Sequence, residues 1–254
     1  MVNALVKPMG IAPSINADRP PLPIGLRNTA NALTEAIADV HRRGWCDGTS
    51  GNFSCTILKD PVELLMAPSG VPKAAVLPQD LIVIDEQARV IHGTGKASAE
   101  TLLHLSVVTN TGAGAVLHTH SQAATLLSRY FGPDQFNPSS SSHHPNHQSK
   151  TIQQAHLFGK IELKDLEMLK GLKGISSHNN AVIISVLKND QNIENLSTQA
   201  TSILKDAPHG FLISGHGLYA WGKDIQEARR HLEILEFLLE LRWRQLLLDL
   251  LIKN

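Results

Sequence analysis

Four segments of the chain carry apolar residues at the spacing of about 3.6 residues that is typical of a helix. These predicted helices cover residues 26–43, 98–108, 121–129 and 224–252. Ser98 and Ser121 are predicted to cap the second and third helices, because a serine hydroxyl can accept a hydrogen bond from a free N–H group of the first turn. Asp224 and Glu227 form an Asp-x-x-Glu pattern that indicates a capped start of the last helix.

Short apolar runs separated by Gly, Pro and Asp predict β-strands between these helices. The expected strands are residues 52–58, 64–67, 81–84, 114–117, 181–187 and 210–214. Strands mixed with helices throughout indicate a layered α/β domain, and since no repeat or linker divides it, we expect one domain over residues 25–254. Residues 1–24 contain five prolines without periodicity and are predicted to form an extended arm. Residues 131–150, rich in Pro, Ser, His and Asn, are predicted to form a long mobile loop.

Composition and charge narrow the choice of partners. The 254 residues are 42% hydrophobic, with 23 basic and 23 acidic side chains, so we expect a folded chain with no formal net charge. A chain without a basic surplus is poorly suited to nucleic acid, which attracts proteins through its phosphates. No apolar run reaches the roughly 18 residues of a membrane span, so no membrane partner is expected. Cys46 and Cys55 fit no disulfide or metal framework, which favours free thiols and a cytoplasmic protein.

Candidate metal ligands lie where predicted strands end. His118 and His120 follow an apolar run, and residues two apart point to the same face of a strand. His216 ends another apolar run between Gly215 and Gly217, which permit backbone turns that other residues avoid. A lone His-x-His pair would be explained by local hydrogen bonds. Three strand-end histidines instead favour one metal site with an open position, as in catalytic zinc sites, and the remaining histidines are interpreted as structural or solvated.

Three loops are rich in Gly, Ser and other small residues: residues 48–54, 67–70 and 96–100. Small residues leave backbone N–H groups free to point at an anion, and hydroxyl and amide groups can complete its shell. Lys96 adds a positive charge, and the helix predicted to begin at Ser98 adds its dipole. Ordinary turns have the same composition. The loops by themselves therefore leave both a phosphate site and simple turns open.

The order of five motifs resembles that of the class II aldolase-like proteins. The motifs are TSGNFS (49–54), APSG (67–70), KASAET (96–101), AVLHTHS (115–121) and GHGLYAWG (215–222). More closely, residues 26–245 are similar to the methylthioribulose-1-phosphate dehydratase family. The segments EMLKG (167–171) and EARRHLEILEFLLE (227–240) support this narrower resemblance.

This resemblance implies a three-layer α/β/α fold with a mixed central sheet, a homotetramer with sites near subunit interfaces, and a sugar phosphate as substrate. It also implies one Zn²⁺ per subunit, held by His118, His120 and His216. Glu167, in EMLKG, matches the proton-shuttling glutamate of the dehydratases and is the first candidate for the acid and base. Glu100 matches a position that serves the aldolases as base or metal ligand, and it is the second. The positions that match the phosphate cradle of the aldolases are Asn52, Ser69, Gly70, Ser98 and Ala99.

The implied activity is the zinc-dependent dehydration of 5-methylthioribulose 1-phosphate to 2,3-diketo-5-methylthiopentyl 1-phosphate, a hydro-lyase reaction of methionine salvage. Two alternatives stay open. One is a class II aldolase that acts on fuculose or ribulose phosphate. The other is an interaction module of the adducin type that has kept the fold without the chemistry, although the presence of all three histidines argues against it.

Overall fold

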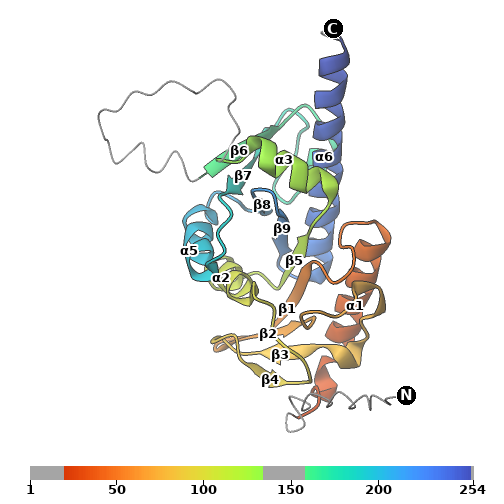
Figure 1. Cartoon of the computed structure of the whole chain (residues 1–254), viewed down its shortest axis with the longest axis vertical. Coiled ribbons are helices and arrows are strands. Elements are labelled where there is room, and N and C mark those ends of the chain that lie inside the picture. Colours follow the sequence, from red (N-terminus) through yellow and green to blue (C-terminus); the bar gives the residue numbers. More distant parts are fainter. Residues whose placement is uncertain (1–19, 134–157, 253–254) are drawn as a thin grey trace, which may run out of the picture.

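The computed structural model describes residues 20–133 and 158–252 (Figure 1). Within them one sheet carries nine strands in the order β4-β3-β2-β1-β5-β9-β8-β7-β6. The strands are β1 (Asn52–Lys59), β2 (Val62–Met66), β3 (Ile82–Ile84), β4 (Val90–His92), β5 (Ala115–Thr119), β6 (Phe158–Leu163), β7 (Val182–Leu187), β8 (Gly210–Ile213) and β9 (Gly217–Gly222). Neighbouring strands are antiparallel, except for the parallel pair of β7 and β8. The sheet is therefore mixed, as expected.

Helices cover both faces of this sheet. They are α1 (Arg27–Arg42), α2 (Thr101–Thr111), α3 (Gln122–Phe131), α5 (Ile193–Ile203) and α6 (Ile225–Ile252), with short 3-10 helices η1 (Ile24–Leu26), η2 (Lys73–Ala75), η3 (Pro78–Asp80) and η4 (Glu167–Gly171). Buried side chains of α1, α3 and α6 share one core with the sheet, and those of α2 and α5 share a second core on the other face (Figure 1). The three-layer α/β/α architecture is thus confirmed. Among the helices of the described ranges, none combines the length and apolar character needed to cross a bilayer.

Strand β5 lies in the middle of the sheet, between β1 and β9, and is buried along its whole length. Its side chains alternate between the two cores. Ala115 and Leu117 pack beneath α1, α3 and α6, whereas Val116 packs beneath α2 and α5. A strand that is covered on both faces needs apolar residues at successive positions, which explains the continuous apolar run in the sequence.

The predicted helix starts are confirmed at two of three positions. The hydroxyl of Ser121 accepts a hydrogen bond from an N–H group in the first turn of α3, at 3.1 Å. Asp224 Oδ1 accepts the N–H of Glu227 at 2.8 Å where α6 begins. The prediction that Ser98 caps α2 is wrong by two residues, because Glu100 occupies the cap position. The Ser98 hydroxyl accepts the N–H of Glu100 at 3.2 Å and so closes the turn before the helix.

Besides the short 3-10 helices, three strands and one α-helix were not predicted: β4, β6, β9 and α5. Strand β6 buries Ile161 and Leu163 but exposes Lys160 and Glu162, which alternate with them, so its apolar signal is diluted. Helix α5 is mostly polar and is capped by Asn192, whose side chain accepts two N–H hydrogen bonds of the first turn. The predicted arm, residues 1–24, and the predicted loop, residues 131–150, lie largely outside the described residues.

Candidate active site

Two of the three predicted ligands lie at the end of β5. His118 is in the strand and fully buried, and His120 follows it by two residues. Thr119, between them, points to the opposite face and donates a hydrogen bond from Oγ1 to Oε1 of Glu236 in α6, at 2.5 Å. The backbone N–H of His120 donates to the carbonyl of Trp45 at 2.8 Å. Both imidazoles therefore lie on the same side of the strand, as its two-residue period predicts.

His216 reaches these rings from the turn between β8 and β9. Gly215 has a φ of 64°, in the left-handed region that glycine favours. A Cβ atom at Gly217 would lie 1.9 Å from the carbonyl oxygen of Thr119, so the turn can approach β5 this closely only with glycine there. The hydroxyl of Thr125, in α3, donates to the carbonyl of His216 at 3.0 Å. These contacts fix the turn that carries the third imidazole.

The ring nitrogens of the three histidines converge. Nε2 of His118 lies 2.8 Å from Nε2 of His120 and 3.4 Å from Nε2 of His216, and the candidate ligand atoms all lie within 4.8 Å of one another. A tetrahedral zinc ion with Zn–N bonds of about 2.0–2.1 Å separates its nitrogen ligands by about 3.4 Å, so the set fits zinc once the closer pair opens slightly. His118 Nδ1 donates to the carbonyl of Leu218 at 2.9 Å, which leaves the Nε2 lone pair for an ion.

Two of these imidazoles are held in the neutral form that binds metals. Burial lowers the pKa of His118 well below its ordinary value, although the nearby Glu100 carboxylate acts in the opposite direction. Burial, helped by the charge of His216, lowers the pKa of His120 to about 4. At neutral pH both rings therefore offer a free lone pair, and no proton has to be displaced before an ion binds.

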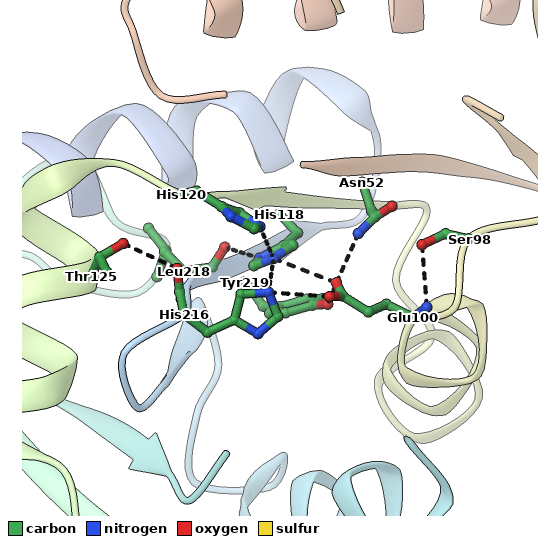
Figure 2. Close-up of polar contacts among 9 residues, drawn as sticks. All are labelled: Asn52, Ser98, Glu100, His118, His120, Thr125, His216, Leu218 and Tyr219. Carbon is green, nitrogen blue, oxygen red and sulfur yellow. Dashed lines mark hydrogen bonds and ion pairs between the residues drawn. The ribbon is translucent and has the colours of Figure 1, made fainter. Parts of the chain in front are cut away.

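Glu100 points into the same cluster (Figure 2). Its Oε1 lies 3.1 Å from Nε2 of His216, and its Oε2 lies 3.4 Å from Nε2 of His118. Asn52 Nδ2 donates to Oε2 at 2.7 Å, and the hydroxyl of Tyr219 donates to the same oxygen. Burial raises the pKa of Glu100, but the hydrogen bonds from His216 and the Tyr219 hydroxyl outweigh it and hold this pKa well below its usual value. An ionised carboxylate at this position can bind a cation or accept a proton.

Tyr219 is a site residue that the sequence did not reveal. It lies on β9 directly opposite His118 on β5, and its ring stacks on that imidazole with centroids 4.0 Å apart and planes 13° apart. The ring is fully buried, while its hydroxyl reaches Glu100. Tyr219 thus orients one predicted ligand and the nearby carboxylate at once. The signal available in the sequence was the two-residue alternation along residues 217–222, where Tyr219 lies two positions after Gly217. The sequence pattern was not interpreted as a strand there, so Tyr219 was not identified.

The three small-residue loops come together beside the cluster. The N–H of Ser69 donates to the carbonyl of Lys96 at 2.9 Å, which joins the second loop to the third. Asn52, at the end of the first loop, joins the third through Glu100. Their role in holding phosphate stays a prediction. All six candidate positions are exposed or half-exposed in the chain: Asn52, Ser69, Gly70, Lys96, Ser98 and Ala99.

A buried lysine also stabilises the place where these loops meet. Lys73 is 2% exposed, and its Nζ donates to the carbonyls of Thr49 and Val71 at 3.1 and 3.2 Å. It therefore ties the first loop to the segment that follows the second. Nothing in the local sequence pattern distinguishes Lys73, because a lysine in a loop is usually solvated.

Glu167 lies in a different part of the chain. Its side chain is 72% exposed, and its carboxylate lies 2.5 Å from Nζ of Lys170 and 3.7 Å from Nδ1 of His178. Leu169, in the same 3-10 helix, packs in the core beneath α6, whereas the ring stacked on His118 belongs to the core on the other face of the sheet. In the described part of a single chain, Glu167 is therefore not brought to the three histidines. Its proposed role as proton shuttle stays a prediction.

A fourth histidine, His104, is buried behind the site in α2. Its Nδ1 lies 2.8 Å from the hydroxyl of Ser54, and its ring meets Tyr219 edge to face. Burial lowers the pKa of His104 to about 4, although Glu100 acts in the opposite direction. An unfolded chain has a histidine pKa of about 6.5. The stability that His104 contributes is therefore present above pH 6.5 and is lost as the pH falls toward 4.

We expect the variant His104→Asn to show a weaker pH dependence of unfolding than the unmodified protein, because asparagine can replace the bond to Ser54 but does not titrate. Between pH 7 and pH 5 the unmodified, metal-free protein should lose about 2 kcal/mol more unfolding free energy than the variant. Urea unfolding of both proteins at the two pH values measures this difference. Equal losses would show that folding leaves the pKa of His104 unshifted.

Comparison with known proteins extends these observations. Residues 31–243 match the family described as Class II Aldolase and Adducin N-terminal domain. A methylthioribulose-1-phosphate dehydratase of Methylococcus capsulatus is 36% identical over 218 residues, which are 85% of this chain and 93% of the relative. A protein of the same name from Hahella chejuensis is 35% identical over 83% of this chain and 90% of the relative.

Solved structures agree with the fold. The L-fuculose-1-phosphate aldolase of Thermus thermophilus has a TM-score of 0.63 and 23% sequence identity, with 88% of this chain and 98% of that chain covered. A sugar-phosphate aldolase of Thermotoga maritima has a TM-score of 0.61 and 19% identity over 88% of this chain and 97% of that chain. At these identities the likeness shows a shared architecture.

Proposed function

The chain belongs to the class II aldolase and adducin family and, within it, to the methylthioribulose-1-phosphate dehydratases, and from this premise we propose that it removes water from 5-methylthioribulose 1-phosphate. The product is then 2,3-diketo-5-methylthiopentyl 1-phosphate, and the reaction is a step of methionine salvage. The observation that carries the proposal is the convergence of three imidazoles and one carboxylate beside the small-residue loops.

The proposed metal is one Zn²⁺ per subunit, held by His118, His120 and His216. When bound, it supplies a Lewis acid beside the substrate carbonyl, where negative charge develops as the neighbouring proton leaves. The convergence of three imidazole nitrogens supports zinc, and the choice follows from ligand type rather than from a bound ion.

The chain's own groups divide the remaining tasks. The loops around Ser69 and Ser98 are suited to hold the phosphate through backbone N–H groups and hydroxyls. A carboxylate must take the proton from carbon 3 of the substrate and return a proton to the hydroxyl that leaves carbon 4, so that one water is lost. Glu100 is the carboxylate beside the histidines, held by Asn52 and Tyr219. Glu167 is the carboxylate that the family resemblance indicates.

We further propose that the protein is a homotetramer, in which Glu167 reaches the histidines of a neighbouring subunit. Two features support this arrangement. Glu167 is exposed and lies on the face of the sheet away from its own cluster. The last turns of α6 expose a run of apolar side chains of a kind that is rare on a monomer and frequent at an interface. These residues are Leu247, Leu248, Leu250, Leu251 and Ile252.

The zinc-loaded protein should convert 5-methylthioribulose 1-phosphate to the diketone without releasing a smaller phosphorylated fragment. Parallel incubations with fuculose 1-phosphate and ribulose phosphate provide the comparison, because an aldolase breaks a carbon–carbon bond and releases a dihydroxyacetone-type fragment. Product analysis by mass spectrometry and by trapping of that fragment reads out both reactions.

Cleavage of a sugar phosphate, with no dehydration, would replace the proposal by the aldolase alternative, which the position of Glu100 beside the histidines favours. A protein that binds no zinc and acts on none of these substrates would instead favour the interaction module.

A further inference from the structure

A buried carboxylate lies directly behind the candidate metal site and has no part in the proposed reaction. Glu236, in α6, is 2% exposed. Its Oε1 accepts a hydrogen bond from Thr119 Oγ1 and its Oε2 accepts one from Ser121 Oγ, both at 2.5 Å. Among the ion pairs of residues 20–133 and 158–252, none includes Glu236. The partners of this buried carboxyl group are therefore two hydroxyl groups of one short segment.

That segment is the one that carries two of the three candidate ligands. Thr119 and Ser121 alternate with His118 and His120, so the hydroxyls and the imidazoles point to opposite faces. Rotation of the segment about its own axis would move both hydroxyls and both rings together. A group that holds positions 119 and 121 therefore also sets the direction in which the rings at 118 and 120 point.

The end of β5 needs such an anchor. His120 lies beyond the last strand residue, and its N–H bonds to the carbonyl of Trp45 rather than to a neighbouring strand. Ser121 also accepts an N–H hydrogen bond of α3, so the carboxylate joins the strand end, the start of α3 and the middle of α6. Three elements are thereby fixed at the point where the imidazoles leave the backbone.

A buried carboxylate at position 236 carries a free-energy cost of desolvation, and packing of the core alone would not require this residue type. Burial raises the pKa of Glu236 to about 7, and the hydrogen bonds from Ser121 and Thr119 oppose this rise. An apolar residue of similar size would avoid the desolvation of a charged group. When this carboxylate is ionised, its hydrogen bonds are shorter and more strongly oriented than neutral ones, so it restrains two side chains that apolar packing would leave freer.

We propose that Glu236 is a positioning residue that holds His118 and His120 in the geometry for metal binding, by fixing Thr119 and Ser121 from the opposite face of the sheet. This inference rests on the three-histidine metal site proposed above. Glu236 lies on the face opposite the three histidines, so its effect on them passes through the backbone of the β5 end.

The test measures metal binding in the full-length protein after complete removal of metal. We expect Glu236→Gln, which keeps the shape but not the charge, to raise the zinc dissociation constant about tenfold in competition with a coloured chelator. The visible absorption spectrum of the Co²⁺-loaded variant should change as well, because it reports the arrangement of the ligands. Thr119→Val removes one of the two hydroxyls at constant shape and should shift both readouts in the same direction.

A matched control is Glu233→Gln, one turn earlier on α6, whose carboxylate lies 3.6–3.7 Å from Arg43 and Arg229. It makes the same chemical change without contact with β5 and should leave the zinc affinity and the Co²⁺ spectrum unchanged. The double variant of Thr119 and Glu236 should lose no more affinity than the single Glu236 variant, because both changes remove the same interaction.

The inference is overturned if Glu236→Gln binds zinc as the unmodified protein does, or if the two losses simply add. It is also overturned if the variant loses only the thermal stability of its metal-free form and keeps the Co²⁺ spectrum, since that result identifies a general packing role. None of these measurements uses the substrate. A protein that binds zinc but does not dehydrate methylthioribulose phosphate would refute the proposed function and leave this inference intact.

Discussion

Replacement of His216 by alanine is expected to remove the bound metal and to lower the turnover of the dehydration by at least about 1,000-fold. Two histidines remain in this variant, and two nitrogen ligands hold zinc too weakly to keep it through purification. Without the Lewis acid, the charge that develops beside the carbonyl has no strong electrostatic partner, and the loss of a single such contact already costs about 100- to 1,000-fold in other enzymes. His216 is preferable to His118 for this experiment, because His118 lies fully buried in the sheet.

Zinc content by mass spectrometry and turnover of the same preparation should fall together. His92→Ala is a suitable control, because His92 lies in β4 at the edge of the sheet, four strand positions from β5. That variant should keep both the metal and the activity. If His216→Ala kept stoichiometric zinc, the third ligand would have to be reassigned.

Glu100→Gln is expected to lower turnover about 100- to 10,000-fold while the zinc content stays close to one per subunit. The amide is nearly the same size as the carboxylate and can still accept a hydrogen bond from Tyr219 or from Asn52. It cannot accept a proton, so only the transfer step is lost. A variant that lost the metal as well would show that Glu100 is a ligand to the ion rather than a base.

Glu167→Gln gives the matched comparison. The family resemblance predicts that this variant also keeps zinc and loses most of its turnover. If Glu167 acts on the neighbouring subunit, mixed oligomers of the His216→Ala and Glu167→Gln proteins should regain activity, because some sites then combine intact histidines with an intact Glu167. Normal turnover of Glu167→Gln would leave Glu100 as the carboxylate that carries both proton transfers.

The three histidines were predictable because their signal is local. The two-residue period of a strand places His118 and His120 on one face, and the glycines around His216 mark a turn at a strand end. The α/β layers were predictable for a similar reason, since a strand such as β5 that is covered on both faces is apolar at successive positions. These features depend on a few neighbouring residues.

Tyr219 and Glu236 were not predictable in this way. Tyr219 meets Glu100 at a separation of 119 positions, and Glu236 meets Thr119 at a separation of 117. Each follows a regular pattern along its own element, as an apolar strand residue or a helix residue with a buried side. Only the pairing of β5 with β9 and the packing of α6 against the sheet give these residues their partners. The placement of Glu167 depends equally on the tertiary fold, which a short motif does not encode.

The proposed ligands come from two segments that lie 98 positions apart in the chain, at the end of β5 and in the turn before β9. An unfolded chain does not hold these segments together, so an ion can select only the folded form. By mass action, free zinc at a hundred times its dissociation constant adds about 2.7 kcal/mol to the free energy of unfolding. With zinc as the proposed ion, the heat tolerance of this protein would depend on its surroundings as much as on its sequence, and a cell poor in zinc would hold a more fragile protein.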